Sequence, residues 1–375
     1  MSDLPLWEQY RDQFPVTKNR VYLNHAAVAP LSRRAAEAMQ TLAQDVLDFG
    51  SEHYLQWMAA YEGVRAGAAS MINATPSEIA IVKNTSEGIA TVAIGIDWKP
   101  GDIVVAFEEE FPANIYPWQR MEAAGVQIRW LSIFDPLDRI DEAAKGARLL
   151  AISYVQYLSG YRVDLDMIGE ICHRRSCFFF VDAIQGMGAF PIDVQSSHID
   201  ALAADGHKWL LGPEGCGVLY VRRELQDRIE PVEFGWTNVA KYADYASRDM
   251  SLRQDAGRYE CGTLNTIGCF GLRAAFELLL DVGIPKVSVA VQALGDQVWE
   301  GANEHGFETL GQRSPATGAG IVSIRKPGVE SQFIVRQLRE AGFVAAPRQG
   351  WVRIAPHFYI APEEIEALLR TLRTF

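Results

Sequence analysis

The chain has 375 residues, of which 49% are hydrophobic and 22% are charged, as is typical of a globular protein with a large core. Its net charge of −12 argues against nucleic acid or an anionic membrane as a partner, although it leaves room for a basic pocket that binds a small anion. The first residues lack the pattern of a signal peptide, and no apolar stretch has the length of a membrane span. We therefore expect a cytoplasmic protein.

The cysteines are five in number and show no C-x-x-C spacing. Several lie within apolar or strand-like runs, so we expect buried free thiols in a reducing compartment and no structural metal site. They are Cys172, Cys177, Cys216, Cys261 and Cys269.

The chain is long enough for two domains, and its pattern changes along its length. Residues 1–30 are expected to cross between the domains. From about residue 78 to 222, apolar strands alternate with helical patterns, which predicts an α/β domain over residues 31–285 with a mostly parallel sheet flanked by helices. The expected strands are 78–84, 102–110, 126–133, 147–156, 177–183, 199–205 and 215–223, with helices over 85–96 and 164–175.

The last part of the chain predicts a smaller α+β domain over residues 286–375. Its expected elements are a strand over 318–326, a helix over 331–342, a strand over 350–356 and a helix over 361–375. Pro362 suits the first turn of the last helix, and the acidic residues after it suit the positive end of the helix dipole.

Polar and aromatic residues follow the ends of five predicted strands. In an open parallel sheet these ends lie along one edge, where ligands bind. We therefore expect a pocket at that edge. The residues that would form it are 84–87, 108–111, 153–157, Asp182 and 205–208.

Lys208, in the motif ADGHKWLLGPEGCG, suggests the chemistry of this pocket. A lysine amine whose pKa is lowered can form a Schiff base, and pyridoxal phosphate is the cofactor that uses one. Asp182, directly after a buried strand, suits the pyridine nitrogen, and the strand-to-helix turn at residues 84–86 suits the phosphate. Taken singly, each of these features also fits a structural role, such as a turn aspartate or a helix cap.

Seven motifs occur in the order found in a known enzyme family: NTSEGIATVA, EEFPANIYPWQ, ISYVQYLSGYRVDL, VDAIQGMGAFPIDV, DGHKWLLGPEGCGVLY, YECGTLNT and VRIAP. Together they resemble the class V aminotransferase superfamily, the fold-type I pyridoxal-phosphate enzymes that include cysteine desulfurases, selenocysteine lyases and isopenicillin-N epimerases. The resemblance runs from VYLNHAA near residue 21 to WVRIAPHFY near residue 351. It implies pyridoxal 5'-phosphate as cofactor and a small amino acid as substrate.

The resemblance also implies how the cofactor is bound. Lys208 would form the Schiff base, and Asp182 would pair with the pyridine nitrogen. Gln185 would hydrogen-bond the phenolic oxygen of the ring, and Phe111 would stack on the ring face. The phosphate would be held by Thr85, Ser86 and His207.

Three further residues complete the expected site. Thr263, in the motif CGTLNT, matches a residue that reaches the cofactor phosphate of the other subunit, which implies a homodimer. Arg353 matches the arginine that binds a substrate carboxylate, for which the guanidinium fork is well suited. His25, in VYLNHAA, is expected to join Arg353 in binding the substrate.

The departures from the family pattern bear on the reaction. Phe111 stands where cysteine desulfurases have a histidine that stacks on the ring and also transfers protons. The loop before Arg353 lacks the sulfur-accepting cysteine of those enzymes, which argues against a persulfide-forming desulfurase. Tyr157 replaces a frequent asparagine near the ring. Asp205 replaces a frequent Ser or Thr, and we expect it to orient His207 or a backbone amide.

Several reactions stay open at this stage. Loss of the α-proton to Lys208 leads to a lyase when a β-substituent leaves, to an epimerase when the α-carbon is reprotonated, and to an aminotransferase when the cofactor carbon is protonated. We favour a lyase, including β-elimination with C–S cleavage, or an epimerase-like activity. The alternatives are an aminotransferase, a cysteine desulfurase with an atypical sulfur acceptor, and a non-catalytic protein that binds pyridoxal phosphate.

Overall fold

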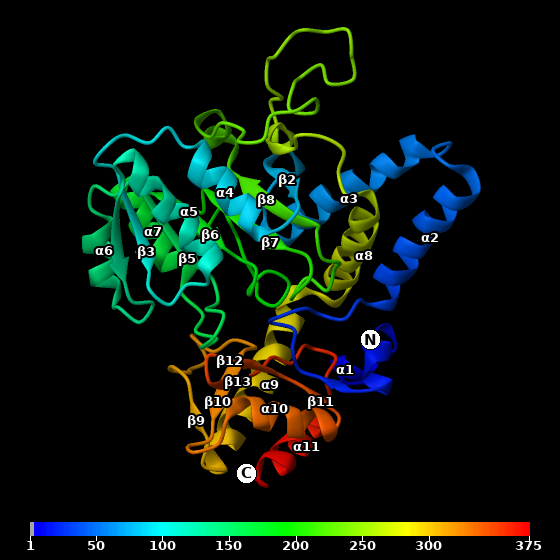
Figure 1. The fold of residues 1–375 in the computed structure, drawn as a ribbon, viewed down its shortest axis with the longest axis vertical. Helices are drawn as coiled ribbons and strands as arrows, with labels where there is room; N and C mark the ends of the chain where they lie inside the picture. Colours follow the sequence, from blue (N-terminus) through cyan, green and yellow to red (C-terminus); the bar gives the residue numbers. More distant parts are fainter. Residues whose placement is uncertain (1–3) are drawn as a thin grey trace.

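The computed structural model describes residues 4–375 and contains two main sheets (Figure 1). The larger sheet has seven strands in the order β2-β8-β7-β6-β5-β3-β4. Only β8 runs against the others, because it pairs antiparallel with both β7 and β2 while the remaining pairs are parallel. The strands are β2 Ile79–Val82, β3 Ile103–Phe107, β4 Gln127–Leu131, β5 Leu149–Ser153, β6 Phe178–Asp182, β7 Ala201–Asp205 and β8 Gly217–Val221.

The central strands are buried on both faces, which explains their continuous apolar sequences. Every residue of β5, β7 and β8 is buried, and helices cover the sheet on both sides. The predicted α/β fold with a mostly parallel sheet is therefore confirmed. The helices of this part are α2 Arg33–Phe49, α3 Tyr54–Ile72, α4 Thr85–Gly95, α5 Tyr116–Arg120, α6 Leu137–Ala144, α7 Leu165–Arg175 and α8 Thr266–Val282.

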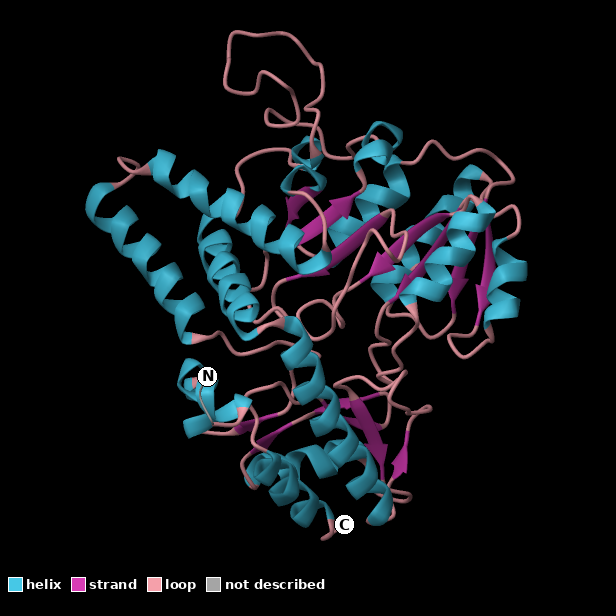
Figure 2. Cartoon of the chain, turned by 180° about the vertical axis from the view of Figure 1, so that it is seen from behind, coloured by secondary structure: helices cyan, strands magenta, loops and turns pink. Residues whose placement is uncertain are grey.

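The smaller sheet is antiparallel and has the order β12-β13-β10-β9 (Figure 2). The predicted second, smaller α+β unit is thereby confirmed, and its division from the first at residue 286 stays a prediction. Its elements are α9 Ile284–Glu304, β9 Glu308–Thr309, β10 Val322–Arg325, α10 Ser331–Glu340, β11 Phe343–Val344, β12 Ala346–Arg348, β13 Trp351–Ile354 and α11 Pro362–Leu372. Within residues 4–375, no helix combines the length and apolar character needed to cross a bilayer.

From residue 4 onward, the N-terminal segment contacts both units, and its expected role as a crossing segment over residues 1–30 stays a prediction. After α1 (Leu6–Tyr10), strand β1 (Val21–Tyr22) pairs with β11 of the small unit. A few residues later, the Ala29 N–H donates to the carbonyl of His207 over 2.7 Å, next to the expected active-site lysine. This segment therefore ties the small unit to the edge of the large sheet.

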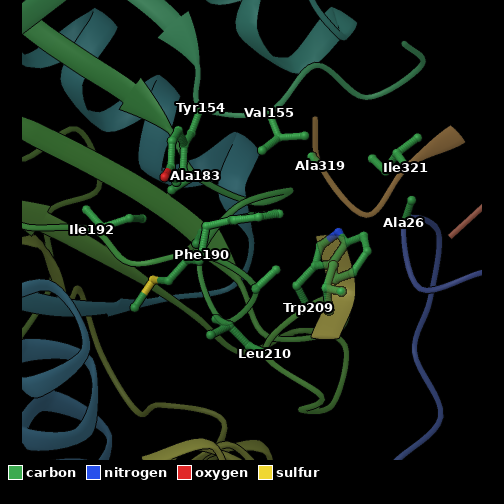
Figure 3. Close-up of a cluster of buried hydrophobic side chains, with 14 of the residues drawn as sticks. Ala26, Tyr154, Val155, Ala183, Phe190, Ile192, Trp209, Leu210, Ala319 and Ile321 are labelled. Atoms are coloured by element: carbon green, nitrogen blue, oxygen red, sulfur yellow. The ribbon is translucent and has the colours of Figure 1, made fainter. Parts of the chain in front are cut away.

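Trp209 packs at the junction of the two units (Figure 3). Its indole is fully buried near Ala319 and Ile321 of the small unit. Gly320 lies so close that a Cβ there would come within 2.5 Å of the indole. Because Trp209 directly follows Lys208, this packing fixes the direction in which the lysine leaves the backbone.

A buried ion pair holds helix α3 to the segment that follows β8. Arg65 Nη2 lies 2.6 Å from Glu260 Oε2, and the two side chains are only 8% and 3% exposed. Glu260 also accepts a hydrogen bond from the backbone N–H of Ile81 in β2. Removing the arginine would leave a buried carboxylate without its counter-charge.

We expect the Arg65→Ala variant to lose about 3–5 kcal/mol of unfolding free energy. The matched control is Glu62→Ala, which removes the other, 70% exposed partner of Arg65 and should cost less than about 1 kcal/mol. Thermal and urea unfolding of both variants beside the parent measures the difference. Equal losses in the two variants would contradict a buried, charge-dependent contact.

Candidate active site

The carboxyl ends of β2, β3, β5, β6 and β7 open onto one cavity of about 570 Å³. This is the sheet edge at which the sequence predicts a pocket. The cavity is lined by Ala26, Ala27, Val28, Asn84, Thr85, Ser86, Phe111, Pro112, Ala113, Ser153, Tyr157, Asp182, Ile184, Gln185, Asp205, His207, Lys208, Arg348, Gln349 and Arg353. Eight of the ten residues predicted for the site are among them.

Lys208 lies largely buried in this cavity, three residues beyond the end of β7. Burial lowers the pKa of its amine to about 8, against the opposing effect of the Asp182 carboxylate and with help from the positive charge of Arg353. About a tenth of the amine is therefore unprotonated at pH 7, far more than at the ordinary lysine pKa, as a nucleophile or base requires. Its Nζ lies 5.9 Å from the centre of the Phe111 ring.

Asp182 ends β6 and is 2% exposed. Its Oδ1 accepts a hydrogen bond of 3.0 Å from the backbone N–H of Ile184, which fixes the direction of the carboxylate. Burial raises the pKa of Asp182 to about 6, although this hydrogen bond and the nearby Lys208 charge favour the ionised form. At neutral pH the cavity thus contains a buried carboxylate that can stabilise a positive group.

Helix α4 begins at the cavity with Thr85 and Ser86, so its free N–H groups and positive dipole end face the pocket. Thr85 Oγ1 accepts a 2.9 Å hydrogen bond from the Asp205 N–H, which joins the helix start to the end of β7. The close approach needs Gly88, because a Cβ there would lie 2.8 Å from that of Ala203. This arrangement is well suited to a phosphate group.

His207 and Asp205 lie side by side beyond β7. His207 Nδ1 is 3.0 Å from Asp205 Oδ2, at ion-pair distance, although the angles are not those of a hydrogen bond. Asp205 is 4% exposed. The contact supports the expectation that Asp205 orients His207.

Gln185 is held on both sides of its amide. Its Oε1 accepts from the Trp209 indole N–H over 2.8 Å, and its Nε2 donates to the Ala26 carbonyl over 3.0 Å. The amide has a second N–H besides the one bonded to Ala26, and Gln185 lines the cavity. Gln185 therefore links the N-terminal segment to the loop that carries Lys208.

Arg353 reaches the cavity from β13 of the small unit and is 3% exposed. Its Nη1 donates to the Tyr157 carbonyl over 2.9 Å, while its buried Nε has no hydrogen-bond partner among residues 4–375. Burial and the neighbouring Arg348 lower the pKa of Arg353 to about 10, so it stays cationic at neutral pH. A carboxylate would satisfy its free N–H groups.

Two predicted residues lie outside the cavity. Thr263 is exposed on another part of the surface, beside Cys261 and Lys83. The prediction that His25 binds substrate is wrong, because its side chain is fully buried and bonded internally. Its Nδ1 is 2.7 Å from the Ala355 carbonyl and its Nε2 is 2.5 Å from the Tyr359 hydroxyl.

The structure shows a buried carboxyl group, Glu110, which the sequence placed at this edge only as part of residues 108–111 and without a role of its own. Glu110 Oε1 accepts from the backbone N–H of Ser153 over 2.6 Å, and Oε2 accepts from the Ser153 hydroxyl. Ser153 lines the cavity and pairs in register with Asp182. Burial raises the pKa of Glu110 to about 8, and the nearby Asp182 charge acts in the same direction. The run of three glutamates after β3 was the only signal in the sequence.

The site therefore offers a lysine of lowered pKa, a buried aspartate, a helix N-terminus and a buried arginine within one cavity, and the residues present fit pyridoxal phosphate. The sequence matches the family model for aminotransferase class V over residues 21–351. The chain belongs to the class V aminotransferase family. Its cofactor is pyridoxal phosphate, on which this family depends.

Proteins similar to this chain include cysteine desulfurases and a C–S lyase. The chain is 31% identical to a probable cysteine desulfurase of Pyrococcus abyssi, with 97% of this chain and 96% of the relative covered. A cysteine desulfurase structure from Thermococcus onnurineus NA1 is 27% identical with a TM-score of 0.92, covering 100% and 99% of the chains. The cystine C–S lyase C-DES, solved with its product cysteine persulfide, is 25% identical with a TM-score of 0.89, covering 97% and 100%.

Glu110 gives a prediction about stability and pH that needs no cofactor. Because its folded pKa is raised from the ordinary 4.5 to about 8, the folded state keeps a proton that the unfolded state has lost. The contribution of Glu110 to stability therefore falls as pH rises from about 5 to 8 and then levels off.

In the parent, the free energy of unfolding should fall with rising pH by about 1.4 kcal/mol per pH unit at most because of Glu110. We expect the Glu110→Gln variant to lack this fall. Urea unfolding of the apoprotein between pH 5 and 9 measures it. Glu109→Gln is the matched control, since Glu109 is the neighbouring carboxylate that bonds to Ser132 and Ile133 on the other side. Parallel pH curves for the parent and Glu110→Gln would contradict the raised pKa.

Proposed function

We propose that the protein is a lyase that eliminates the β-substituent of an amino acid, with cleavage of a C–S bond. The observation that carries this proposal is the content of the cavity: Lys208 is present as a base, whereas Phe111 stands in place of a proton-transferring histidine and no cysteine lines the walls. The C–S lyase and desulfurases among the relatives support the same class of reaction.

The proposed roles of the cofactor-binding residues follow from their places in the cavity. Lys208 would hold the cofactor aldehyde, and Asp182 would pair with its ring nitrogen. Gln185 would donate to the phenolic oxygen and Phe111 would pack on the ring. The phosphate would lie at the start of α4, held by Thr85, Ser86 and His207. When bound, the cofactor withdraws electrons from the substrate α-carbon.

Arg353 would bind the substrate carboxylate and so orient the α-carbon toward Lys208. The lowered pKa of Lys208 suits a group that must accept the α-proton near neutral pH. The electron pair left at the α-carbon forms the α,β double bond, and the C–S bond breaks as the sulfur leaves with its own pair. A thiolate is a stable leaving group at this pH, so the reaction needs no acid where Phe111 stands.

Persulfide transfer fits the cavity less well than elimination. All five cysteines lie within the described residues as free thiols, and none of them lines the cavity. Cys216 and Cys269 lie 3.7 Å from each other in the core behind the loop that carries Lys208. An enzyme that stores sulfur on its own thiol would need an accessible cysteine at the substrate.

The decisive experiment is incubation of the holoenzyme with L-cystine and a panel of L-amino acids in deuterated water. We expect pyruvate and ammonia in equal amounts from L-cystine, at a rate at least 1000-fold above the Lys208→Ala control. The keto acid is measured with lactate dehydrogenase, and chirality by chromatography. Loss of chirality with α-deuteration and no keto acid would instead establish an epimerase, and amino transfer to an added keto acid an aminotransferase.

We also propose that the protein is a homodimer in which Thr263 completes the partner's phosphate site. Thr263 is exposed and lies outside the cavity of its own subunit. Large apolar side chains are also exposed around the connection between helices α2 and α3, which suits a subunit contact. They are Val46, Leu47, Phe49 and Leu55.

We expect Thr263→Ala to weaken cofactor binding about 5- to 20-fold, as the loss of a hydrogen bond to a charged group does, without changing the dimer mass. Equilibrium dialysis of the cofactor and light scattering measure the two quantities. Ser314→Ala, a hydroxyl deletion on the surface of the small unit, is the control. A monomeric protein, or unchanged cofactor affinity, would contradict this role.

A further inference from the structure

The cavity contains a second arginine, Arg348, to which the proposed function assigns no role. We propose that Arg348 binds a second anionic group on the substrate, so that the preferred substrate is an amino acid whose sulfur-linked β-substituent ends in a carboxylate. This inference rests on the proposed elimination and names the substrate class for it.

A tight hairpin holds Arg348 in place. Arg348 ends β12, and β13 begins at Trp351, with Arg348 and Trp351 paired across the hairpin. The two turn residues, Gln349 and Gly350, have φ of 47° and 84°. Positive φ at both positions is the signature of the two-residue turn that best joins antiparallel strands. The backbone beneath Arg348 is therefore fixed rather than part of a long loop.

The register of the hairpin brings Arg348 and Arg353 to the same face of the sheet. Ala346 pairs with Arg353, and Arg348 lies two residues beyond Ala346 on the same side of the strand. Such diagonal neighbours lie about 7–8 Å apart, with their Cβ atoms somewhat closer. Both side chains line the cavity, so two guanidinium groups face the same space.

Arg348 lines the cavity with part of its side chain exposed to solvent, and within residues 4–375 it forms no salt bridge. The acidic residues that line the cavity are Asp182 and Asp205, and both have partners at the cofactor end. The positive charge of Arg348 lowers the pKa of Arg353 and, to a smaller degree, of Lys208. This mutual repulsion is relieved when each guanidinium receives its own anion.

Polar groups next to Arg348 extend the subsite. Gln349 Nε2 donates to the Tyr157 hydroxyl over 2.9 Å, which holds both side chains at the same wall of the cavity. Tyr157 packs edge-on against Phe111, with ring centres 5.3 Å apart. The wall thus offers an apolar surface for the methylene groups of a β-substituent and a cation for its end.

The test compares two thioether substrates of nearly equal length in the holoenzyme: S-(2-carboxyethyl)-L-cysteine and S-propyl-L-cysteine. We expect the carboxylate substrate to be favoured in kcat/KM by about 10- to 100-fold, the effect of a charge-assisted hydrogen bond. In Arg348→Ala this preference should disappear through a higher KM for the carboxylate substrate alone. Arg348→Lys should keep part of it, because it keeps the charge.

Arg325→Ala is the matched control for the loss of one positive charge. Arg325 stacks on Trp351, the residue paired with Arg348 across the hairpin, and forms a salt bridge with Glu308 outside the cavity. Its removal should leave the preference unchanged. An equal loss of preference in Arg325→Ala and Arg348→Ala would overturn the proposal, since it would point to hairpin stability instead of a direct contact.

A binding measurement separates this inference from the proposed reaction. By calorimetry, the parent protein should bind succinate about 10-fold more tightly than butyrate, and Arg348→Ala should bind both alike. If that holds while neither the thioethers nor L-cystine yields pyruvate, the elimination is wrong and the anion subsite stands. If both thioethers react equally in the parent and in Arg348→Ala, the subsite is overturned and the elimination stands.

Discussion

The common direction of six of the seven strands in the large sheet is the constraint on which the site depends. Because parallel strands end at the same edge, residues from distant parts of the sequence meet there without any need for long loops. Lys208, Asp182 and Thr85 each lie within a few residues of such an end. The antiparallel strand β8 then carries the chain away from the lysine and back across the sheet.

Burial at this edge gives the site its chemical properties. The same loss of water lowers the pKa of Lys208 and raises those of Asp182 and Glu110. One environment therefore favours an unprotonated amine at Lys208 and a protonated carboxyl group at Glu110. The cost of burying these carboxyl groups is limited by direct partners. Ile184 stabilises Asp182, and Ser153 stabilises Glu110.

The small unit supplies the two arginines that line the cavity. It contributes Arg353 and Arg348 from one hairpin, and these face the large sheet across a junction filled by Trp209. In the proposed roles, substrate choice therefore depends on how the two units pack, whereas cofactor binding depends mainly on the large sheet. The buried histidines behind Trp209, with His25 neutral because burial lowers its pKa to about 4, belong to this packing and not to the substrate site.

The sequence alone determined the sheet, the edge and most of the residues at it. Apolar runs followed directly by polar residues are a local pattern, and the rule for parallel sheets converts that pattern into Lys208, Asp182, Thr85 and Phe111 in one pocket. Only the tertiary structure decided which way individual side chains point. His25 follows a short strand beside the cavity, yet its ring faces the core, because the Ala355 carbonyl and the Tyr359 hydroxyl lie on that side. The buried state of Glu110 and the position of Arg348 beside Arg353 follow only from the contact with Ser153 and from the hairpin register. Burial and charge compensation depend on residues far away in the chain.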